Sequence, residues 1–341
     1  MPNKHQQHFH EWIQASLPRA SRLKGALVAD QLVGDAGFRC YYRLNTEPSL
    51  IAVDSPPFKE NNPAYVNIAM ALQSEGLRTP IIHAVDFTHG FMLLEDFGVQ
   101  SLHPLLNDQT VSQLYNRAET LLLELQQLPD NEQLYPRYDA QLLEDEMVLF
   151  NQWFVTDLLG IDLEAAEIAM LGSLYASLIE SAEEQPQVWV HRDYHSRNLM
   201  VLENHELGII DFQDALWGPI TYDLVSLLKD CYVRWPAQQT RQRATAFKEQ
   251  LGLEIDDQQF LRWFDLMGLQ RHIKVMGIFA RLALRDGKKG YLNDLPMVIE
   301  YSLEAARDYP EGQAFCDWFE HRITPLLGSQ SWYVQSQGSA L

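Results

Sequence analysis

Three polar side chains have the types and the spacing of a phosphoryl-transfer centre: Asp193, Asn198 and Asp211. A carboxylate and an amide oxygen suit Mg²⁺, which takes one or two protein ligands and completes its shell with water and phosphate oxygens. We therefore expect Asn198 and Asp211 to hold Mg²⁺, and Asp193 to accept or orient the proton of an attacking hydroxyl group. Each residue alone has a plainer interpretation, because Asp and Asn also cap helices and stabilise turns.

The segment that carries Asn198 and Asp211 predicts a β-hairpin. Two short apolar runs, 198–202 and 207–211, are joined by the polar turn 203–206, a pattern typical of two paired strands. Counting inward from a four-residue turn places Asn198 directly opposite Asp211, with about 5 Å between their Cβ atoms. The hairpin would thus bring both oxygen ligands to one point.

Protein kinases place these groups in the motifs H-R-D-x-x-x-x-N and D-F-G. This chain matches them at His191, Asp193, Asn198, Asp211 and Phe212, with Gln213 in place of the glycine. By resemblance to such kinases, His191 would brace the catalytic loop. A zinc site at His191 and His195 is disfavoured, because such a pair needs a helix to bring both rings to one side.

The composition predicts a cytoplasmic enzyme. The chain has 341 residues, 46% of them hydrophobic, enough for about two domains or lobes. It lacks an apolar run that could span a bilayer, and its polar start lacks a signal-peptide pattern. Three scattered cysteines argue against a disulfide framework or a metal cluster. The formal charge of −20 argues against a nucleic-acid partner and is compatible with a small-molecule substrate.

The hydrophobic pattern predicts an α+β, protein-kinase-like two-lobe fold. Residues 1–97 would form a small antiparallel sheet lobe that binds the nucleotide and ends in a hinge. Residues 98–341 would form a mostly helical lobe with the catalytic loop, the metal site and the substrate site. Strands are expected between 26 and 53, over 81–87 and over 90–94, and helices over 5–17, 61–74, 111–128, 144–159, 164–180, 222–232, 258–285 and 297–307.

In such a fold ATP would lie at the junction of the lobes. The hinge would comprise Glu95, Asp96 and Phe97, and the turn over the phosphates would comprise Gly34, Asp35 and Gly37. The hinge would bind the adenine through its backbone. A glycine-rich turn alone is weak evidence, because most such turns are ordinary hairpins.

Together these segments resemble the aminoglycoside-phosphotransferase and choline-kinase-like superfamily. The catalytic motifs and the segments 34–43, 93–98 and 217–228 carry this resemblance. Segments 53–57 and 270–281 more closely resemble bacterial N-acetylmuramate/N-acetylglucosamine anomeric kinases of cell-wall recycling. The resemblance implies transfer of the γ-phosphate of ATP to the anomeric hydroxyl group, which gives a sugar 1-phosphate. A kinase of another small alcohol, such as an aminoglycoside or an amino alcohol, and a non-catalytic pseudokinase remain alternatives.

One position departs from the kinase pattern. Protein kinases carry a phosphate-binding Lys in V-A-I-K, whereas this chain has Asp54 at the matching place. A compensating cation is therefore expected, and Arg39 and Arg43 are the nearest candidates. The alternative is that both arginines simply face solvent.

Further candidates lie in the second half of the chain. Arg271, Lys274, Arg281 and Arg285 fall within about a quarter of one helix circumference, a basic stripe that could meet the lactyl carboxylate of muramate. Its alternative is a solvated face paired with the protein's own acids. Trp217 could pack against a sugar ring, or belong to the core. We expect Asp223 to bond the backbone of the catalytic loop, with a helix N-cap as the alternative.

Overall fold

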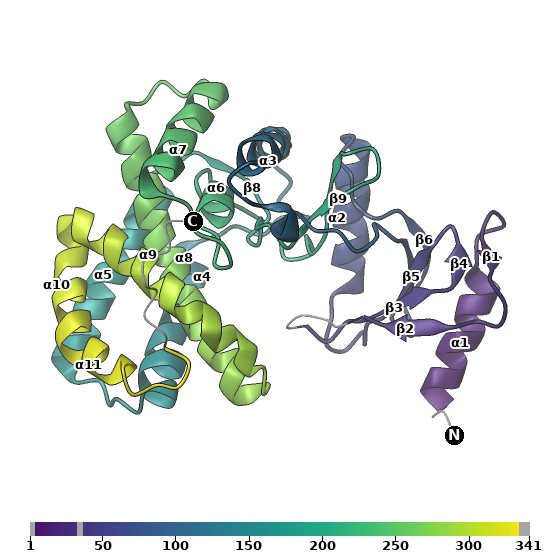
Figure 1. Cartoon of the computed structure of the whole chain (residues 1–341), viewed down its shortest axis with the longest axis horizontal. Helices are drawn as coiled ribbons and strands as arrows, with labels where there is room; N and C mark the ends of the chain where they lie inside the picture. Colours follow the sequence, from purple (N-terminus) through teal and green to yellow (C-terminus); the bar gives the residue numbers. More distant parts are fainter. Residues whose placement is uncertain (1–3, 33–36, 334–341) are drawn as a thin grey trace. The chain divides into compact units, whose positions relative to one another are not determined.

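The computed structural model describes residues 4–32 and 37–333, and it divides into two compact units whose elements are labelled in Figure 1. Unit 1 comprises residues 1–104 and 197–214, and unit 2 comprises 105–196 and 215–341. This division differs from the expected boundary after Phe97, which assigned the hairpin to the helical lobe. The nucleotide-binding and substrate-binding roles of the lobes stay predictions.

Unit 1 is built on a five-stranded antiparallel sheet of order β2-β3-β5-β7-β6. Its strands are β2 (Ala29–Gln31), β3 (Cys40–Leu44), β5 (Leu50–Asp54), β6 (Ile82–Asp86) and β7 (Phe91–Glu95), and β1 (Arg22–Leu23) and β4 (Thr46–Glu47) pair separately. The inner strands β5 and β7 are apolar and buried on both faces along four consecutive residues each, as a central strand requires.

Two helices accompany this sheet. Helix α1 (Lys4–Ser16) packs Phe9 and Ile13 into a cluster with the buried side chains of β5 and β7. Helix α2 (Asn62–Ser74) begins where the side chain of Asn61 accepts a hydrogen bond from the Ala64 amide at 3.1 Å. A cap of this kind contributes about 1 kcal/mol, and both helices occupy the ranges expected from the sequence.

The hairpin of β9 (Leu199–Val201) and β10 (Leu207–Ile209) forms, but its predicted register is wrong by one residue. Leu199 pairs with Ile209, and the Ile210 amide donates to the Asn198 carbonyl at 3.2 Å. The reason is the turn: the His205 amide bonds the Leu202 carbonyl at 2.8 Å, and His205 has a φ of 66°. These features describe a three-residue loop that ends in the left-handed region, where the sequence suggested four residues.

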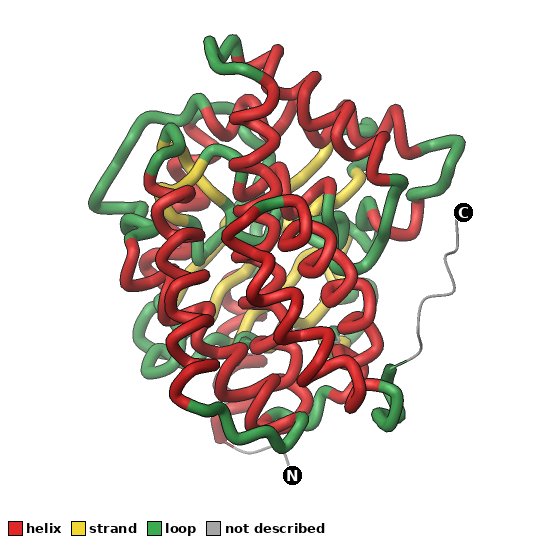
Figure 2. The backbone as a smooth tube through the Cα atoms, turned by 90° about the vertical axis from the view of Figure 1, so that its left-hand side faces the viewer, coloured by secondary structure: helices red, strands yellow, loops and turns green. Residues whose placement is uncertain are grey.

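Unit 2 is mostly helical (Figure 2). Its helices are α3 (Val111–Gln126), α4 (Ala140–Leu149), η2 (Phe150–Leu158), α5 (Ala165–Glu183), α6 (Tyr222–Leu228), α7 (Ala237–Leu251), α8 (Asp257–Arg285), η3 (Lys289–Asp294), α9 (Leu295–Asp308), α10 (Pro310–Trp318), η4 (Phe319–Ile323) and α11 (Thr324–Leu327), after the short turn η1 (His103–Leu105). The strands β8 (Gln187–Val190) and β11 (Leu216–Pro219) pair antiparallel. None of the described helices combines the length and hydropathy that a membrane crossing requires.

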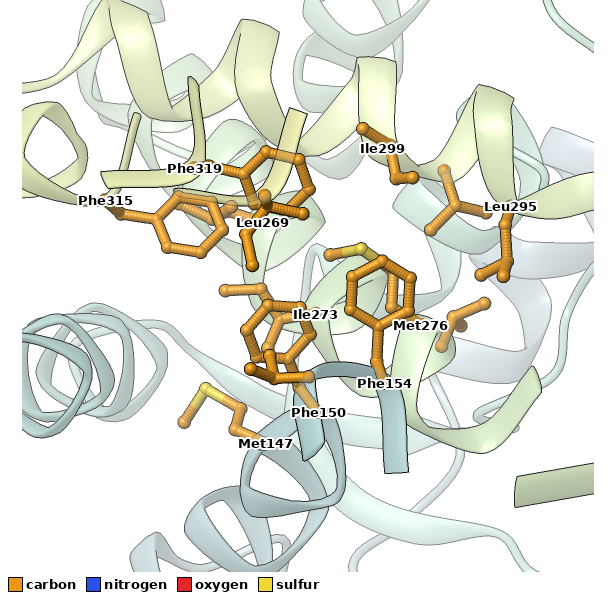
Figure 3. Packing of buried hydrophobic residues seen from close by; sticks show 14 of the residues in the cluster. Met147, Phe150, Phe154, Leu269, Ile273, Met276, Leu295, Ile299, Phe315 and Phe319 are labelled. Atoms are coloured by element: carbon orange, nitrogen blue, oxygen red, sulfur yellow. The ribbon is translucent and has the colours of Figure 1, made fainter. Parts of the chain in front are cut away.

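Helix α8 is the central element of unit 2. Its side chains meet those of η2, α9 and α10 in one apolar cluster, which Figure 3 shows around Phe150, Ile273 and Met276. A glycine is required at position 277, where α8 packs against the end of α4, because a Cβ atom there would lie 2.4 Å from the backbone of Leu149. The helix also buries several polar residues within this apolar setting, and two of them, Arg271 and Lys274, belong to the site described below.

Some helices were predicted correctly from the sequence, and others were missed or predicted with different ends. The helices near 111–128, 164–180, 258–285 and 297–307 are confirmed as α3, α5, α8 and α9. Helix α6 ends at Leu228, four residues before its expected end, and the predicted helix over 144–159 begins earlier as α4 and continues as the π-helical η2. Helix α7 was missed because its sequence is almost uniformly polar and it buries few apolar side chains.

Candidate active site

The loop between β8 and residue 196 is held from both ends by buried carboxylates. Asp223 accepts hydrogen bonds from the amides of His191 at 2.6 Å and Arg192 at 3.0 Å. Asp230 accepts one from the Ser196 amide at 3.0 Å and another from its hydroxyl group. The expectation that Asp223 bonds the loop backbone is therefore confirmed. It is not an N-cap, because Thr221 occupies that position of α6.

The backbone of this loop has an uncommon conformation. Arg192 has a φ of 76°, a left-handed value that costs energy for a residue with a side chain. The Asp193 amide donates to Nδ1 of His191 at 3.3 Å, and the ring of His191 is buried. His191 thus contacts the loop backbone, and its bracing role stays a prediction.

Asp193 is an accessible carboxylate among cationic side chains. It is exposed to solvent, although protein atoms pack densely around it. Burial favours the protonated acid, but the electrostatic effect of His195, Lys274, Arg271 and Arg192 outweighs it and lowers the pKa of Asp193 to about 2. Asp193 is therefore ionised at neutral pH, ready to accept a hydrogen bond from a hydroxyl group.

A buried carboxylate that the sequence did not reveal organises two of these cations. Glu146 of α4 forms ion pairs with Arg192 and, at 2.9 Å, with Lys274, and it accepts a hydrogen bond from the Tyr138 hydroxyl group. Lys274 also donates to the Tyr222 hydroxyl at 3.1 Å. Burial would raise the pKa of Glu146, yet Lys274 and Arg192 hold it below its usual value. The one signal in the sequence is that Glu146 occupies a position of the helical pattern that is otherwise apolar, beside Leu143 and Met147.

Arg271 lies near Asp193 but has a different partner. Its Nη1 donates to Sγ of Cys231 at 3.2 Å, and only 2% of the residue is exposed. Burial raises the pKa of the Cys231 thiol to about 11, so the group that accepts this bond is neutral. Two members of the basic stripe, Arg271 and Lys274, are thus buried and do not form a solvated face, although Lys274 does pair with one of the protein's own acids, Glu146.

The other two arginines of the basic stripe lie in the last turns of α8. Arg285 pairs with the adjacent Asp286 at 2.8 Å and is exposed, and Arg281 is partly buried beside them. Trp217 lies on β11, where the Arg137 guanidinium stands 5.8 Å from its ring centre. The contacts seen for Trp217 are those of a structural residue, and its role toward a sugar stays a prediction.

In unit 1, Asp211 lies in the electrostatic neighbourhood of Arg39. Burial raises the pKa of Tyr41 and Tyr65 well above the usual value; in both tyrosines Arg39 opposes this change and Asp211 adds to it. Asp211 has a φ of 65°, and its Oδ1 accepts a hydrogen bond from Gln213 at 2.8 Å. The next side chain, Phe212, stacks on Tyr65 with ring centres 5.0 Å apart.

Arg39 and Arg43, the two candidates for the missing cation, have different settings. The Arg39 guanidinium lies 3.1 Å from Glu60 and 5.5 Å from the centre of the Tyr65 ring, and its buried Nε has no hydrogen-bond partner among the described residues. Arg43 is bound through two nitrogens to Asp96, at 2.6 and 2.9 Å, and to the Gly98 carbonyl. Neither arginine simply faces solvent, and Arg43 is committed to the protein.

The acidic side chains of the predicted hinge are bound by other groups of the protein. Glu95 pairs with Arg78 at 2.7 Å, and Asp96 also accepts hydrogen bonds from Ser49 and the Gly98 amide. The Phe97 ring packs so closely on Gly208 of β10 that a Cβ atom there would lie 2.4 Å from it. These side chains fix the end of β7, and the adenine-binding role of the backbone stays a prediction.

The turn predicted to cover the phosphates is only partly described. Gly34 and Asp35 lie outside the described residues, and Gly37 is exposed beside Arg39. Asp54, which stands where kinases carry the Lys, pairs with His5 of α1 at 2.7 Å and so contributes to the docking of that helix. It cannot bind phosphate.

The donor set of unit 1 fits a hard cation. An amide oxygen and a carboxylate, from Asn198 and Asp211, are suitable ligands for Mg²⁺. Within the described part of the chain, no group of three or more His, Cys, Asp or Glu residues could hold a metal alone. An ion at these two residues would therefore depend on phosphate oxygens and water for the rest of its shell, as Mg²⁺ commonly does.

Known proteins resemble this chain over most of its length. Residues 29–264 match the model of the phosphotransferase enzyme family. A curated relative from Pseudomonas aeruginosa, named N-acetylmuramate/N-acetylglucosamine kinase, is 37% identical over 89% of this chain and 93% of its own length. A relative of the same name from Pseudomonas putida is 40% identical over 81% of this chain and 83% of its own length.

Solved structures show the same fold. An ADP-bound aminoglycoside phosphotransferase, APH(2'')-Ib, superposes with a TM-score of 0.58 at 12% identity and covers 89% of this chain and 99% of its own. This likeness confirms the expected α+β, protein-kinase-like fold. With a family match that spans most of the sequence, the conclusion is that the chain belongs to the phosphotransferase enzyme family and is a small-molecule kinase.

Proposed function

We propose that this kinase transfers the γ-phosphate of ATP to the anomeric hydroxyl group of N-acetylmuramate, N-acetylglucosamine or both, and releases the sugar 1-phosphate. The observation that carries the proposal is the match to relatives named for these sugars, over 81 to 89% of the chain. Asp193, Asn198 and Asp211, the groups that phosphoryl transfer needs, are all present in a chain that matches in this way.

Unit 2 would supply the group that acts on the acceptor. Asp193 would accept the hydrogen bond of the attacking hydroxyl group, orient its lone pair toward phosphorus and take its proton as the new P–O bond forms. Its low pKa, about 2, makes it a weak base. Orientation of the hydroxyl would therefore be its larger contribution, and proton transfer would follow as the oxygen becomes more acidic on bonding to phosphorus.

Unit 1 would supply the groups that bind the nucleotide. Asn198 and Asp211 would hold Mg²⁺, which neutralises charge on the phosphates of ATP. Arg39 would provide the cation that the missing strand lysine supplies in protein kinases, with Glu60 taking the place of that lysine's acidic partner. Glu95, Asp96 and Phe97 would present backbone groups to the adenine.

The surroundings of Asp193 bear on the choice of acceptor. The cations Arg271, Lys274 and Arg192 act electrostatically on Asp193. A polycationic aminoglycoside would be repelled by such a site, whereas a neutral or anionic sugar would be accepted. This electrostatic setting favours the amino sugars over the aminoglycoside alternative that the family also contains.

The test is product analysis by phosphorus and proton NMR. The protein is incubated with Mg²⁺, ATP and, separately, N-acetylmuramate, N-acetylglucosamine, choline or kanamycin, with Asp193→Asn as the control. A sugar 1-phosphate that depends on Asp193 is the expected product. Phosphorylated choline or kanamycin without sugar phosphate would refute the sugar assignment, and no product from any acceptor would favour a pseudokinase.

A further inference from the structure

Arg271 is a buried cation without a carboxylate partner. Within the described residues no carboxylate forms an ion pair with it, its Nε atom has no hydrogen-bond partner, and its one hydrogen bond goes to the Cys231 thiol. A thiol is a weak acceptor, and this one is neutral. Leaving a guanidinium buried in this way is costly, so the arrangement needs a reason other than stability.

Neighbouring cations are satisfied by protein acids. Arg192 and Lys274 share Glu146, and Lys229, at the C-terminal end of α6, pairs with Asp265 at 2.8 Å. The carboxylate of Asp223 is also near Arg271 electrostatically, but its two oxygens accept the loop amides of His191 and Arg192. Arg271 therefore differs from the cations around it in lacking an anionic hydrogen-bond acceptor.

The position of Arg271 indicates what kind of anion it would meet. Its charge acts on Asp193, the residue that would orient the acceptor hydroxyl. A guanidinium binds a carboxylate through two parallel hydrogen bonds, and exchanging the weak bond to Cys231 for such a pair costs little. N-acetylmuramate differs from N-acetylglucosamine by a lactyl ether that carries one carboxylate.

We propose that Arg271 binds the lactyl carboxylate of N-acetylmuramate and so selects this sugar over N-acetylglucosamine. The inference rests on the proposed function, because it names a determinant of acceptor choice at the same site. The transferring phosphoryl group is the other anion that reaches Asp193. Arg271 bound to the lactyl carboxylate would affect one sugar, whereas Arg271 bound to the phosphoryl group would affect both. Kinetics with the two sugars therefore distinguish these roles.

The experiment compares kcat and KM for both sugars in the wild type, Arg271→Gln, Arg271→Lys and Arg262→Gln. Loss of one charge-assisted hydrogen-bonded contact should lower kcat/KM for N-acetylmuramate by about 10- to 150-fold, mainly through KM. The value for N-acetylglucosamine should stay within about twofold, and Arg271→Lys should recover part of the loss. Arg262 lies on the same helix and pairs with Glu311 at 2.6 Å, so Arg262→Gln serves as the matched control, with no change expected in kcat/KM for either sugar.

A second substrate keeps the test decisive if Arg271→Gln folds poorly. The lactyl amide of N-acetylmuramate preserves the shape of the group and removes its charge, so the wild type should lose the same factor with it as Arg271→Gln loses with the acid. Equal use of acid and amide would overturn the proposal. So would a fall in kcat that is the same for both sugars, which would assign Arg271 to the phosphoryl group. Failure of the wild type to phosphorylate either sugar would refute the proposed function itself.

Discussion

The end of β7 in unit 1 and the loop and helix around Asp193 in unit 2 are both rich in charge, but their charges are satisfied differently. At β7, Asp96 accepts four hydrogen bonds and Arg43 is bound to it through two nitrogens. Around Asp193 the carboxylate is exposed and Arg271 reaches only a thiol. The difference separates charges that are paired within the fold from a site in which one buried cation, Arg271, contacts a thiol in place of an acid.

The comparison is tested most strongly at Asp193 itself. Asp193→Asn keeps the size of the side chain and removes the charge that would orient the acceptor, so kcat should fall by about 10²- to 10⁴-fold. Steady-state kinetics with the preferred sugar measure this loss, and circular dichroism checks the fold. Asp162→Asn, at another exposed carboxylate of unit 2, is the control and should retain full activity. A similar loss in both variants would contradict the assignment.

Glu146 should matter for stability as well as activity. Glu146→Gln leaves Arg192 and Lys274 without their shared counter-ion, and breaking a buried ion pair from one side costs about 3–5 kcal/mol. Urea unfolding measures the change in the free energy of unfolding. Glu144→Gln, on the exposed side of the same helix, should change it by less than about 0.5 kcal/mol. If the two variants are equally stable, the network around Glu146 does not hold this region together.

The two arginines of unit 1 should separate binding from folding. Arg39→Gln should raise KM for ATP by about 10-fold or more, since a charge-assisted contact to phosphate is worth about 1.5–3 kcal/mol. Arg43→Gln should instead lower the free energy of unfolding by about 1–3 kcal/mol, because Asp96 is left without its cation. Kinetics and denaturant titration of both variants test this. The reverse pattern would make Arg43 the phosphate-binding residue.

The smallest expected effect is that of acid on Asp193. Its folded pKa, about 2, lies below the usual value of about 3.9, so the carboxylate stays ionised, and its contribution to stability is lost only as the pH falls from about 4 through 2. A profile of kcat between pH 5 and 8 should therefore show no acidic limb from this residue. A limb near pH 5 that shifts in Asp193→Glu would show that the surrounding cations act less strongly.

Much of the site could be predicted because its signals are local. The order of Asp193, Asn198 and Asp211 along the chain is a motif, and the resemblance that starts from this motif implied the bond from Asp223 to the loop, which the structure contains. The hairpin register could not be predicted, because the left-handed conformation of His205 removes one residue from the turn. The amino-acid sequence of this segment is compatible with a turn of either length.

Contacts between distant segments were beyond the sequence. Glu146 pairs with Lys274 and with Arg192, which lies 46 residues away from it in the sequence. No spacing rule connects such distant positions. Arg39 and Arg43 occupy equivalent places in a strand pattern, yet only the folded chain gives Asp96 to one and Glu60 to the other. The sequence indicates which groups are present, and tertiary packing decides which of them remain available.

The path of the chain through the two units has a consequence for biosynthesis. Unit 1 ends first at Pro104 and is completed only by residues 197–214, which supply partners such as the Leu199 carbonyl for the Leu102 amide and the Ile209 amide for the Arg78 carbonyl. A ribosome that adds about 5–20 residues per second must continue for on the order of ten seconds before this unit can close. A fragment cut after Pro104 would lack the same partners, so expressing the first hundred residues alone would not isolate the unit.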